Sequence, residues 1–277
     1  MTMTHKPVMV ATDLSARCDR PIERAVKLAQ DWSVKLIVLH VLDPALPENP
    51  KRTRLDIETQ ILDEVPPTKG EVEVIVQEGV VADTINKVAN EKDCGIIVTG
   101  VASYNSLGDI FLGHPVDKLI RHAEAPVLVV KRKPVKSYKN IVIATDFSNC
   151  SMDALNVAAS LFPEAALHLV HAYHVPYETW LKSDQVKIEV KKEEHDLMDQ
   201  FLAKHIVDDN ILKRLDISID EGNLGTVLSN KIEETKSDLL VLGTHGRSGF
   251  MRATIGSNAK TILGWAVQDV LMVRGKK

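Results

Sequence analysis

Short apolar segments alternate along the chain with longer segments in which apolar residues recur at helical spacing. Apolar runs rich in Val, Ile and Leu begin near residues 8, 36, 96, 127, 141, 167, 239 and 270. After the first run, Ile22, Ala25, Val26 and Ala29 have the spacing of the buried face of a helix. Strands that alternate with helices are typical of βαβ units, so we predict an α/β fold with a parallel sheet.

The pattern occurs twice. The motif Ala-Thr-Asp-x-Ser is found at residues 11–15 and again at 144–148, and the pair Glu-Gly is found at 78–79 and again at 221–222. Each copy reads as five strands separated by four helices. A sequence that repeats in this way indicates two homologous domains.

The predicted domains cover residues 1–133 and 138–277, joined by a charged, proline-containing linker. The halves differ in length between their second strand and the Glu-Gly pair, where residues 186–205 predict a helix. In the first half this stretch is short and is interrupted by Pro44, Pro47, Pro50, Pro66 and Pro67. Because proline breaks helices, we expect the first half to lack about three helical turns there.

Composition narrows the function classes. Apolar residues make up 44% of the chain, which is enough for full cores, and the net charge of −4 provides no basic surface for nucleic acid. No apolar run is long enough to span a membrane, and the first residues lack the apolar core of a signal peptide. The cysteines Cys18, Cys94 and Cys150 are isolated, which favours reduced thiols. We expect a cytoplasmic protein without nucleic-acid or membrane partners.

The segment from residue 243 to residue 257 carries the candidate chemistry. An apolar strand leads into Gly243, Gly246 follows, and Gly256 and Ser257 stand where a helix begins. Ligands of open α/β sheets bind beyond the carboxyl ends of the strands, where such loops lie. Glycines allow close approach or a positive φ, and the amides of a helix start favour an anion. Arg247 adds positive charge.

A simpler interpretation gives these residues structural roles only. The glycines would turn the chain, Ser257 would cap the following helix, and Asp146 would cap the helix after the first strand of its half. The segment is neither a Walker A loop nor a Rossmann GxGxxG motif, so P-loop phosphoryl transfer is not indicated.

The spacing Gly243-x2-Gly246-x9-Gly256-Ser257 resembles the G-2x-G-9x-G-(S/T) signature of ATP-binding universal stress proteins. The two Ala-Thr-Asp-x-Ser motifs and the last strand of each half are similar to the same family, and the resemblance covers essentially the whole chain. It implies two tandem adenine-nucleotide alpha-hydrolase-like (Rossmann-like) domains. It also implies ATP as ligand, with Mg²⁺ left open. The implied nucleotide-binding residues are Ala144, Asp146, Ala172, Leu242, Gly243, Gly246, Arg247, Gly256, Ser257 and Asn258.

The first half departs from this signature. Ser103 replaces the second glycine, and Gly113 is followed by His114 and Pro115 where a Ser or Thr is expected. Pro115 has no N–H for a phosphate, and Asp109 adds negative charge. We expect one nucleotide per chain, bound by the second half, and at most a remnant pocket beside Asp13 in the first half.

Three alternatives remain open. The chain could be a scaffold whose halves pair antiparallel through their last strands, at residues 127–130 and 270–273, as the resemblance implies. It could be a true enzyme such as a nucleotidyl transferase, although its first loops lack paired histidines; the expected activity is at most a weak ATPase. His174 and His195 could hold a metal, although no catalytic or metal residue is assigned. Homodimerisation is also left open.

Overall fold

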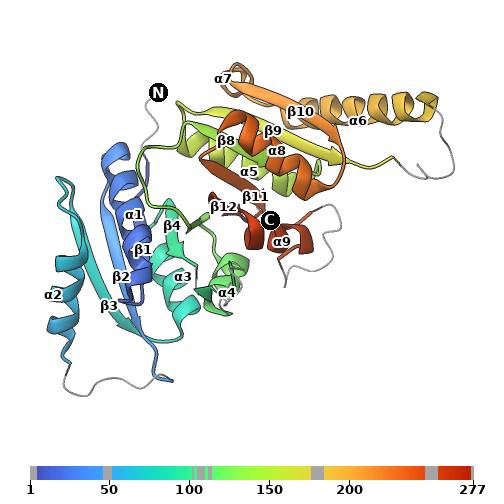
Figure 1. Cartoon of the computed structure of the whole chain (residues 1–277). Helices are drawn as coiled ribbons and strands as arrows, with labels where there is room; N and C mark the ends of the chain where they lie inside the picture. The colour runs from blue at the N-terminus through green and yellow to red at the C-terminus, as the bar shows by residue number, and fades with distance from the viewer. Residues whose placement is uncertain are drawn as a thin grey trace. The chain divides into compact units, whose positions relative to one another are not determined.

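The computed structural model describes residues 5–45, 52–101, 103–104, 110–111, 114–175, 184–246 and 255–275. The chain divides into two compact units (Figure 1). The first unit comprises Met1–Ser137 and Met251–Arg274, and the second comprises Tyr138–Phe250 and Gly275–Lys277.

The first unit contains six strands of one sheet, a short hairpin and several helices. Its sheet strands are β1 (Val8–Thr12), β2 (Leu36–Leu42), β3 (Val72–Glu78), β4 (Ile96–Gly100), β7 (Val127–Val130) and β12 (Asp269–Val273). The hairpin strands are β5 (Ser103–Tyr104) and β6 (Ile110–Phe111). The helices are the 3-10 turn η1 (Ala16–Cys18), α1 (Asp19–Trp32), α2 (Arg54–Glu64), α3 (Val81–Glu91), α4 (His114–His122) and α9 (Ser257–Trp265).

These strands follow the order β12-β7-β4-β1-β2-β3. All neighbours are parallel except β12 and β7, which pair antiparallel with Leu271 opposite Leu128. This pairing confirms the predicted contact between the last strands of the two halves. Its consequence is that the end of the second half belongs to the compact unit of the first half.

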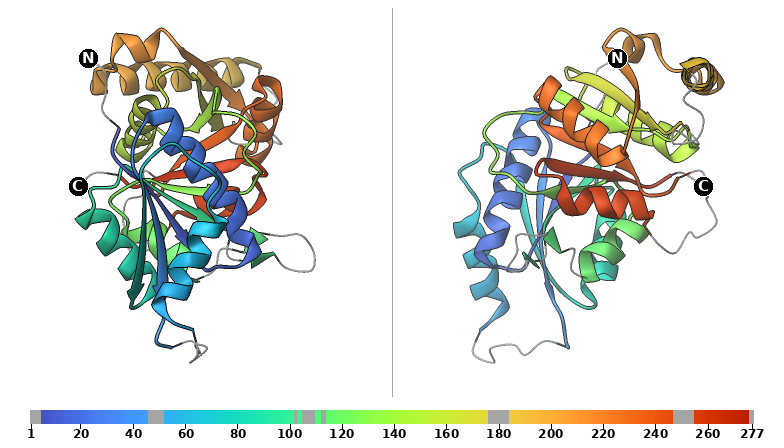
Figure 2. Two further views of the ribbon diagram at one scale, coloured as in Figure 1. Left: turned by 90° about the vertical axis from the view of Figure 1, so that its left-hand side faces the viewer. Right: turned by 45° about the vertical axis from the view of Figure 1, so that its right-hand side comes forward.

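Helices cover both faces of this sheet. Figure 2 shows α1 and α2 on one face and α3 and α4 on the other. Strands covered on both sides must be apolar along their length, and every residue of β7 and β12 is buried. The predicted helical stripe is also confirmed, since Ile22, Ala25, Val26 and Ala29 are at most 5% exposed.

The second unit contains four sheet strands, β8 (Asn140–Ala144), β9 (Ala166–Tyr173), β10 (Leu215–Glu221) and β11 (Leu239–Gly243). Its helices are α5 (Asn149–Leu161), α6 (Asp184–His205), α7 (Asp209–Leu212) and α8 (Leu224–Thr235). The strands follow the order β10-β9-β8-β11, and all neighbours are parallel. The expected α/β fold with Rossmann-like tandem domains is confirmed.

The length difference between the halves lies in one helix. Helix α6 has 22 residues, whereas its counterpart α2 has 11. Eleven residues correspond to about three helical turns, which agrees with the expectation from the prolines. Among the described residues, no helix has both the length and the apolar character needed to cross a lipid bilayer.

Candidate functional site

The second unit brings Asp146 and the first part of the glycine segment to one edge of its sheet. Strands β8 and β11 are adjacent and parallel, with Ile143 opposite Val241. Their carboxyl ends therefore lie at the same edge, where Asp146 follows β8 and Gly243 ends β11. This is the edge at which ligands of open α/β sheets bind.

The Thr-Asp-x-Ser segment forms the same turn in both halves. The hydroxyl oxygens of Thr12 and Thr145 accept hydrogen bonds, each of 3.0 Å, from the amides of Leu14 and Phe147. Leu14 and Phe147 have positive φ angles of 59° and 62°. Non-glycine residues rarely adopt this conformation, so the shared turn holds a local strain in both halves.

In the second half this turn positions Asp146. Its carboxylate accepts a 3.1 Å hydrogen bond from the Ser148 amide. The N-cap of α5 is Ser148, whose side chain accepts a hydrogen bond from the Ser151 amide. The simpler interpretation of Asp146 as a helix cap is therefore wrong, and this carboxylate stays half-buried at the strand edge.

Close packing explains why glycine occupies positions 243 and 246. A Cβ atom on Gly246 would lie 2.5 Å from Oδ2 of Asp146, and one on Gly243 would lie 2.9 Å from Sγ of Cys150. Neither glycine has a φ in the positive range that side chains avoid. The absent side chains thus allow the backbone to approach other protein groups, and at Gly246 that group is the predicted nucleotide contact itself.

The remaining predicted contacts in this unit differ in accessibility. Ala144 and Ala172 are half-buried at the ends of β8 and β9. The side chain of Leu242 is only 3% exposed and belongs to the core. A ligand would therefore meet Leu242 mainly through its backbone.

The strand histidines have one structural position in both halves, as their repetition indicated. Nδ1 of His40 lies 2.9 Å from the Thr12 carbonyl oxygen, and Nδ1 of His171 lies 2.8 Å from that of Thr145. In the second half, Nε2 of His171 also lies 3.3 Å from a Glu194 carboxylate oxygen on α6. The histidine therefore connects the turn, the strand and the long helix.

Two neighbours of this histidine were not singled out from the sequence. The Phe147 ring lies 4.1 Å from the His171 ring, and Glu194 reaches it from α6. The sequence does distinguish Phe147, because it is an aromatic residue at the position of the repeat where the first half has Leu14. Glu194 stands in a run of mixed charges, and only tertiary packing distinguishes it from its neighbours.

The far end of the glycine segment begins α9. Gly256 is the N-cap residue, with φ of −53°, and as a glycine it has no side chain with which to cap the helix. Ser257 is the first residue of the helix, so its interpretation as the cap is wrong. Ser257 and Asn258 are exposed. The hydroxyl of Ser257 and the first amides of α9 are available to an anion.

The two ends of the segment belong to different compact units. Asp146, Gly243 and Gly246 are in the second unit, whereas Gly256 and Ser257 are in the first. Arg247 lies outside the described residues. The joint contact of both ends with one nucleotide therefore stays a prediction.

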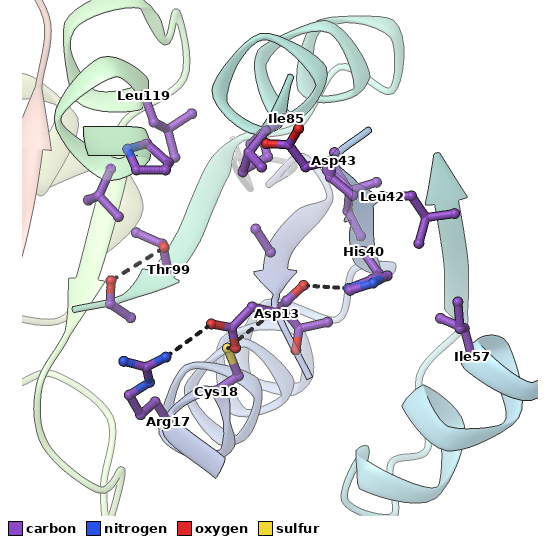
Figure 3. Close-up of a pocket in the computed structure, with 18 of the residues that line it drawn as sticks. Asp13, Arg17, Cys18, His40, Leu42, Asp43, Ile57, Ile85, Thr99 and Leu119 are labelled. Carbon is purple, nitrogen blue, oxygen red and sulfur yellow. Dashed lines mark hydrogen bonds and ion pairs between the residues drawn. The ribbon is translucent and has the colours of Figure 1, made fainter. Parts of the chain in front are cut away.

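The first unit contains a cavity of about 460 Å³ at the equivalent strand ends (Figure 3). Residues from the ends of β1, β2 and β4, from η1, and from α2, α3 and α4 line it. Asp13 and Pro115 are among them, so the expected pocket beside Asp13 is present. Asp109 and Gly113 lie outside the described residues.

Asp13 is held ionised in this cavity. Burial opposes its ionisation, but hydrogen bonds from Ser15 and Cys18 and the charge of Arg17 lower its pKa below the ordinary value. Burial raises the pKa of the Cys18 thiol to about 11, so the thiol stays protonated and lies 3.1 Å from the Asp13 carboxylate. The three cysteines are buried. Among the described residues, no group of three His, Cys, Asp or Glu side chains could hold a metal ion. A metal at His174 and His195 stays a prediction.

Comparison with known proteins identifies both halves. The model of the Universal stress protein family matches residues 4–131 and 137–274. Over 149 residues the chain is 30% identical to a universal stress protein of Methanocaldococcus jannaschii, covering 50% of this chain and 84% of that protein.

Solved structures show the same fold. A universal stress protein from Archaeoglobus fulgidus has a TM-score of 0.70 at 17% identity, covering 99% of this chain and 100% of that one. A universal stress protein in complex with cAMP covers 48% of this chain and 100% of that one, with 19% identity and a TM-score of 0.37. The second likeness is too limited to bear on the ligand of this chain.

Proposed function

Because the chain belongs to the universal stress protein family, we propose that its second half binds one adenine nucleotide, ATP with or without Mg²⁺. Nucleotide occupancy or slow hydrolysis then regulates a stress response in the cytoplasm. The observation that carries this proposal is the packing of Gly246 against Asp146, where an added Cβ would lie 2.5 Å from the carboxylate. Two of the residues that the resemblance implies as nucleotide contacts are thereby adjacent, at the edge of the sheet where ligands of open α/β sheets bind.

Each end of the site has its own part in binding. The half-buried Asp146 carboxylate accepts hydrogen bonds from ribose hydroxyls or the adenine amino group. Ser257 and the first amides of α9 bind phosphate oxygens, with Arg247 adding positive charge. Gly256 keeps the helix start open, and Asn258 contributes a further polar contact.

Efficient hydrolysis is not part of the proposal. Asp146 is the single carboxylate in the proposed site, and it accepts a hydrogen bond from the Ser148 amide. A general base is usually a carboxylate or an imidazole, and the proposed contact residues include one carboxylate and no imidazole. We therefore propose a binding protein with at most weak ATPase activity.

The direct test is mass spectrometry of nucleotide released from freshly purified protein, together with thermal unfolding in ATP. A ligand that binds only the folded protein stabilises it by about 2.7 kcal/mol at a concentration of 100 times Kd. Protein that carries no nucleotide and gains no stability from millimolar ATP would contradict the proposal.

Two variants separate the ends of the site. Asp146→Asn keeps an acceptor for the Ser148 amide but removes the charge. It should therefore raise the Kd for ATP and the Kd for adenosine alike, by about tenfold. Ser257→Ala should raise the Kd for ATP by about fivefold and leave the Kd for adenosine unchanged, because only the contact with the phosphates is lost. The control is Asp199→Asn, the same change at an exposed position of α6.

A scaffold function is the second candidate. The antiparallel pairing of β12 with β7 favours it, since that contact serves domain pairing without a ligand. If cells expressing Asp146→Asn and Ser257→Ala together keep full stress tolerance while the protein no longer binds ATP, the scaffold function is preferred.

A further inference from the structure

The cavity of the first unit is large enough for a small molecule. Its volume of about 460 Å³ falls within the range of small-molecule sites, which is about 300–1,000 Å³. It lies at the strand edge where open α/β sheets bind ligands. The first half lacks a complete nucleotide-binding signature, which argues against a nucleotide as its ligand. A cavity is nevertheless present there.

The described wall of the cavity is mainly apolar and rigid. The apolar side chains that matter here come from β2, α2, α3 and α4, and they are Leu39, Ile57, Ile85, Val116 and Leu119. Each is at most 8% exposed. Because they are fixed by strand and helix packing, they form a preformed apolar surface of the kind that binds the body of a ligand.

Asp13, Arg17 and Cys18 lie together at one end of the cavity, whereas Asp43 is on the side of Ile85 (Figure 3). Leu119 is also on the side opposite Asp13. The side chain of Asp13 is 61% exposed, and its carboxylate is 3.6 Å from the Arg17 guanidinium. A ligand in the cavity therefore meets an accessible carboxylate, which is a strong acceptor for hydroxyl or ammonium donors.

Charge disfavours a polyphosphate. The described lining contains two carboxylates, Asp13 and Asp43, and two guanidinium groups, Arg17 and Arg52, so it has no positive surplus. At the place where the second half has Asn258, directly after Ser257, the first half has Pro115, which lines the wall and has no N–H to donate.

We propose that this cavity is a second binding site, which takes an unphosphorylated small molecule with an apolar body and a hydroxyl or amino head. The body lies against the wall formed by Leu39, Ile57, Ile85, Val116 and Leu119, and the head donates a hydrogen bond to Asp13. The two halves of the chain then bind different classes of ligand. This site is independent of the nucleotide proposed for the second half.

The probes are four compounds with one tail and different heads: octylamine, 1-octanol, octanoate and octyl phosphate. Binding is followed by NMR of isoleucine methyl groups in the full-length protein. Octylamine and octanol should shift the Ile57 and Ile85 methyl signals, and the exposed Ile188 of α6 should stay unchanged. Octanoate and octyl phosphate should bind at least tenfold more weakly than octylamine, since an anionic head carries no positive charge to pair with the Asp13 carboxylate.

Tail length gives a test that needs no variant. Burial of one methylene corresponds to about a fourfold change in Kd. From butylamine to octylamine, the Kd should therefore fall by about that factor for each added methylene. Binding at a surface site would give neither this dependence of Kd on tail length nor shifts of the Ile57 and Ile85 methyl signals.

Variants then separate the head from the body. Asp13→Asn keeps an acceptor for the Ser15 amide and removes only the charge. It should therefore raise the Kd for octylamine about tenfold and the Kd for octanol much less. Asp63→Asn, on the exposed face of α2, is the matched control. Val116→Phe fills the cavity and should abolish binding. Ile85→Phe serves the same purpose if circular dichroism shows that Val116→Phe is unfolded.

Three results would overturn the proposal. The first is absence of methyl shifts with both octylamine and octanol up to their solubility. The second is octyl phosphate or octanoate binding as tightly as octylamine. The third is ATP shifting Ile57 and Ile85 in a manner that depends on Asp13, which would make this cavity a nucleotide site. Loss of ATP binding by the second half leaves the proposal intact, so the two failures are distinguishable.

Discussion

Lys131, just after β7, holds the end of helix α9 from within the core. Its side chain is 5% exposed, and Nζ donates hydrogen bonds to the carbonyl oxygens of Leu263 and Ala266, at 2.6 and 2.5 Å. Asp269 accepts a hydrogen bond from the Lys131 amide and pairs with Arg24 at 3.3 Å. The last carbonyls of a helix lack partners within it, so Lys131 stabilises the helix whose first turn is proposed to bind phosphate.

This lysine should make stability depend on alkaline pH. Burial lowers its pKa from 10.5 to about 8, although Asp269 opposes the shift. The unfolded chain then binds the proton more tightly, so the free energy of unfolding rises as pH increases from about 8 to 10.5. The rise amounts to roughly 3 kcal/mol, and urea titrations of the wild type and of Lys131→Met across this range should show it only in the wild type. Parallel curves for the two proteins would contradict the assignment.

Gly243 and Gly264 should respond oppositely to alanine. A Cβ at position 243 would lie 2.9 Å from Cys150 Sγ, whereas one at position 264 would have no atom within 4 Å among the described residues, its own helix backbone and chain neighbours aside. Gly243→Ala should therefore destabilise the protein by about 1–3 kcal/mol through overpacking. Gly264→Ala should stabilise α9 by up to about 1 kcal/mol. Denaturant unfolding measures both, and a neutral Gly243→Ala would disprove the packing explanation.

At the scale of elements, α6 is the main difference between the halves. Its buried side chains are Met198 and Phe201, and the Phe201 ring lies 5.7 Å from the Phe147 ring. The long helix therefore makes an aromatic contact with the turn that positions Asp146. The sequence predicted the helix and its length, because both follow from local pattern and from proline. It did not predict this contact, because the partners are far apart in the chain.

Phe201→Ala should loosen α6 selectively. Truncation of a buried phenylalanine lowers the free energy of unfolding by about 3–5 kcal/mol. The effect should be concentrated in α6, because few other described residues of this helix are buried. Hydrogen exchange of the α6 amides should become faster, with little change in α2. Ile188→Ala, at a position 68% exposed on the same helix, is the control and should leave exchange unchanged. Equal effects of the two substitutions would show that α6 is not held by Phe201.

At the scale of the whole molecule, the compact units do not coincide with the repeats. Residues Met251–Arg274 come from the second repeat, yet they belong to the first unit. The reason is the antiparallel pairing of β12 with β7, in which Leu271 faces Leu128 and both are fully buried. A sheet edge covered in this way is also protected from aggregation.

Leu271→Ala should therefore destabilise the unit that contains the first repeat. Truncation of a fully buried leucine costs about 2–5 kcal/mol. Hydrogen exchange in β1 and β4 should rise after Leu271→Ala as it does after Leu128→Ala. The control is Leu169→Ala, fully buried in β9, which should act on β8 and β10. If Leu271→Ala instead resembled Leu169→Ala, the assignment of β12 to the first unit would be wrong.

The sequence by itself determined the α/β class, the tandem repeat, the missing helical turns and the positions of Asp146 and of the glycines. These features depend on local periodicity, on backbone limits of proline and on repetition within one chain. Only the tertiary structure decided that Gly256 and not Ser257 caps α9, that Gly243 packs against Cys150, and that β12 joins the first unit. It also decided that the altered first half keeps a cavity, because the wall comes from separate elements whose side chains meet only when the sheet and helices pack.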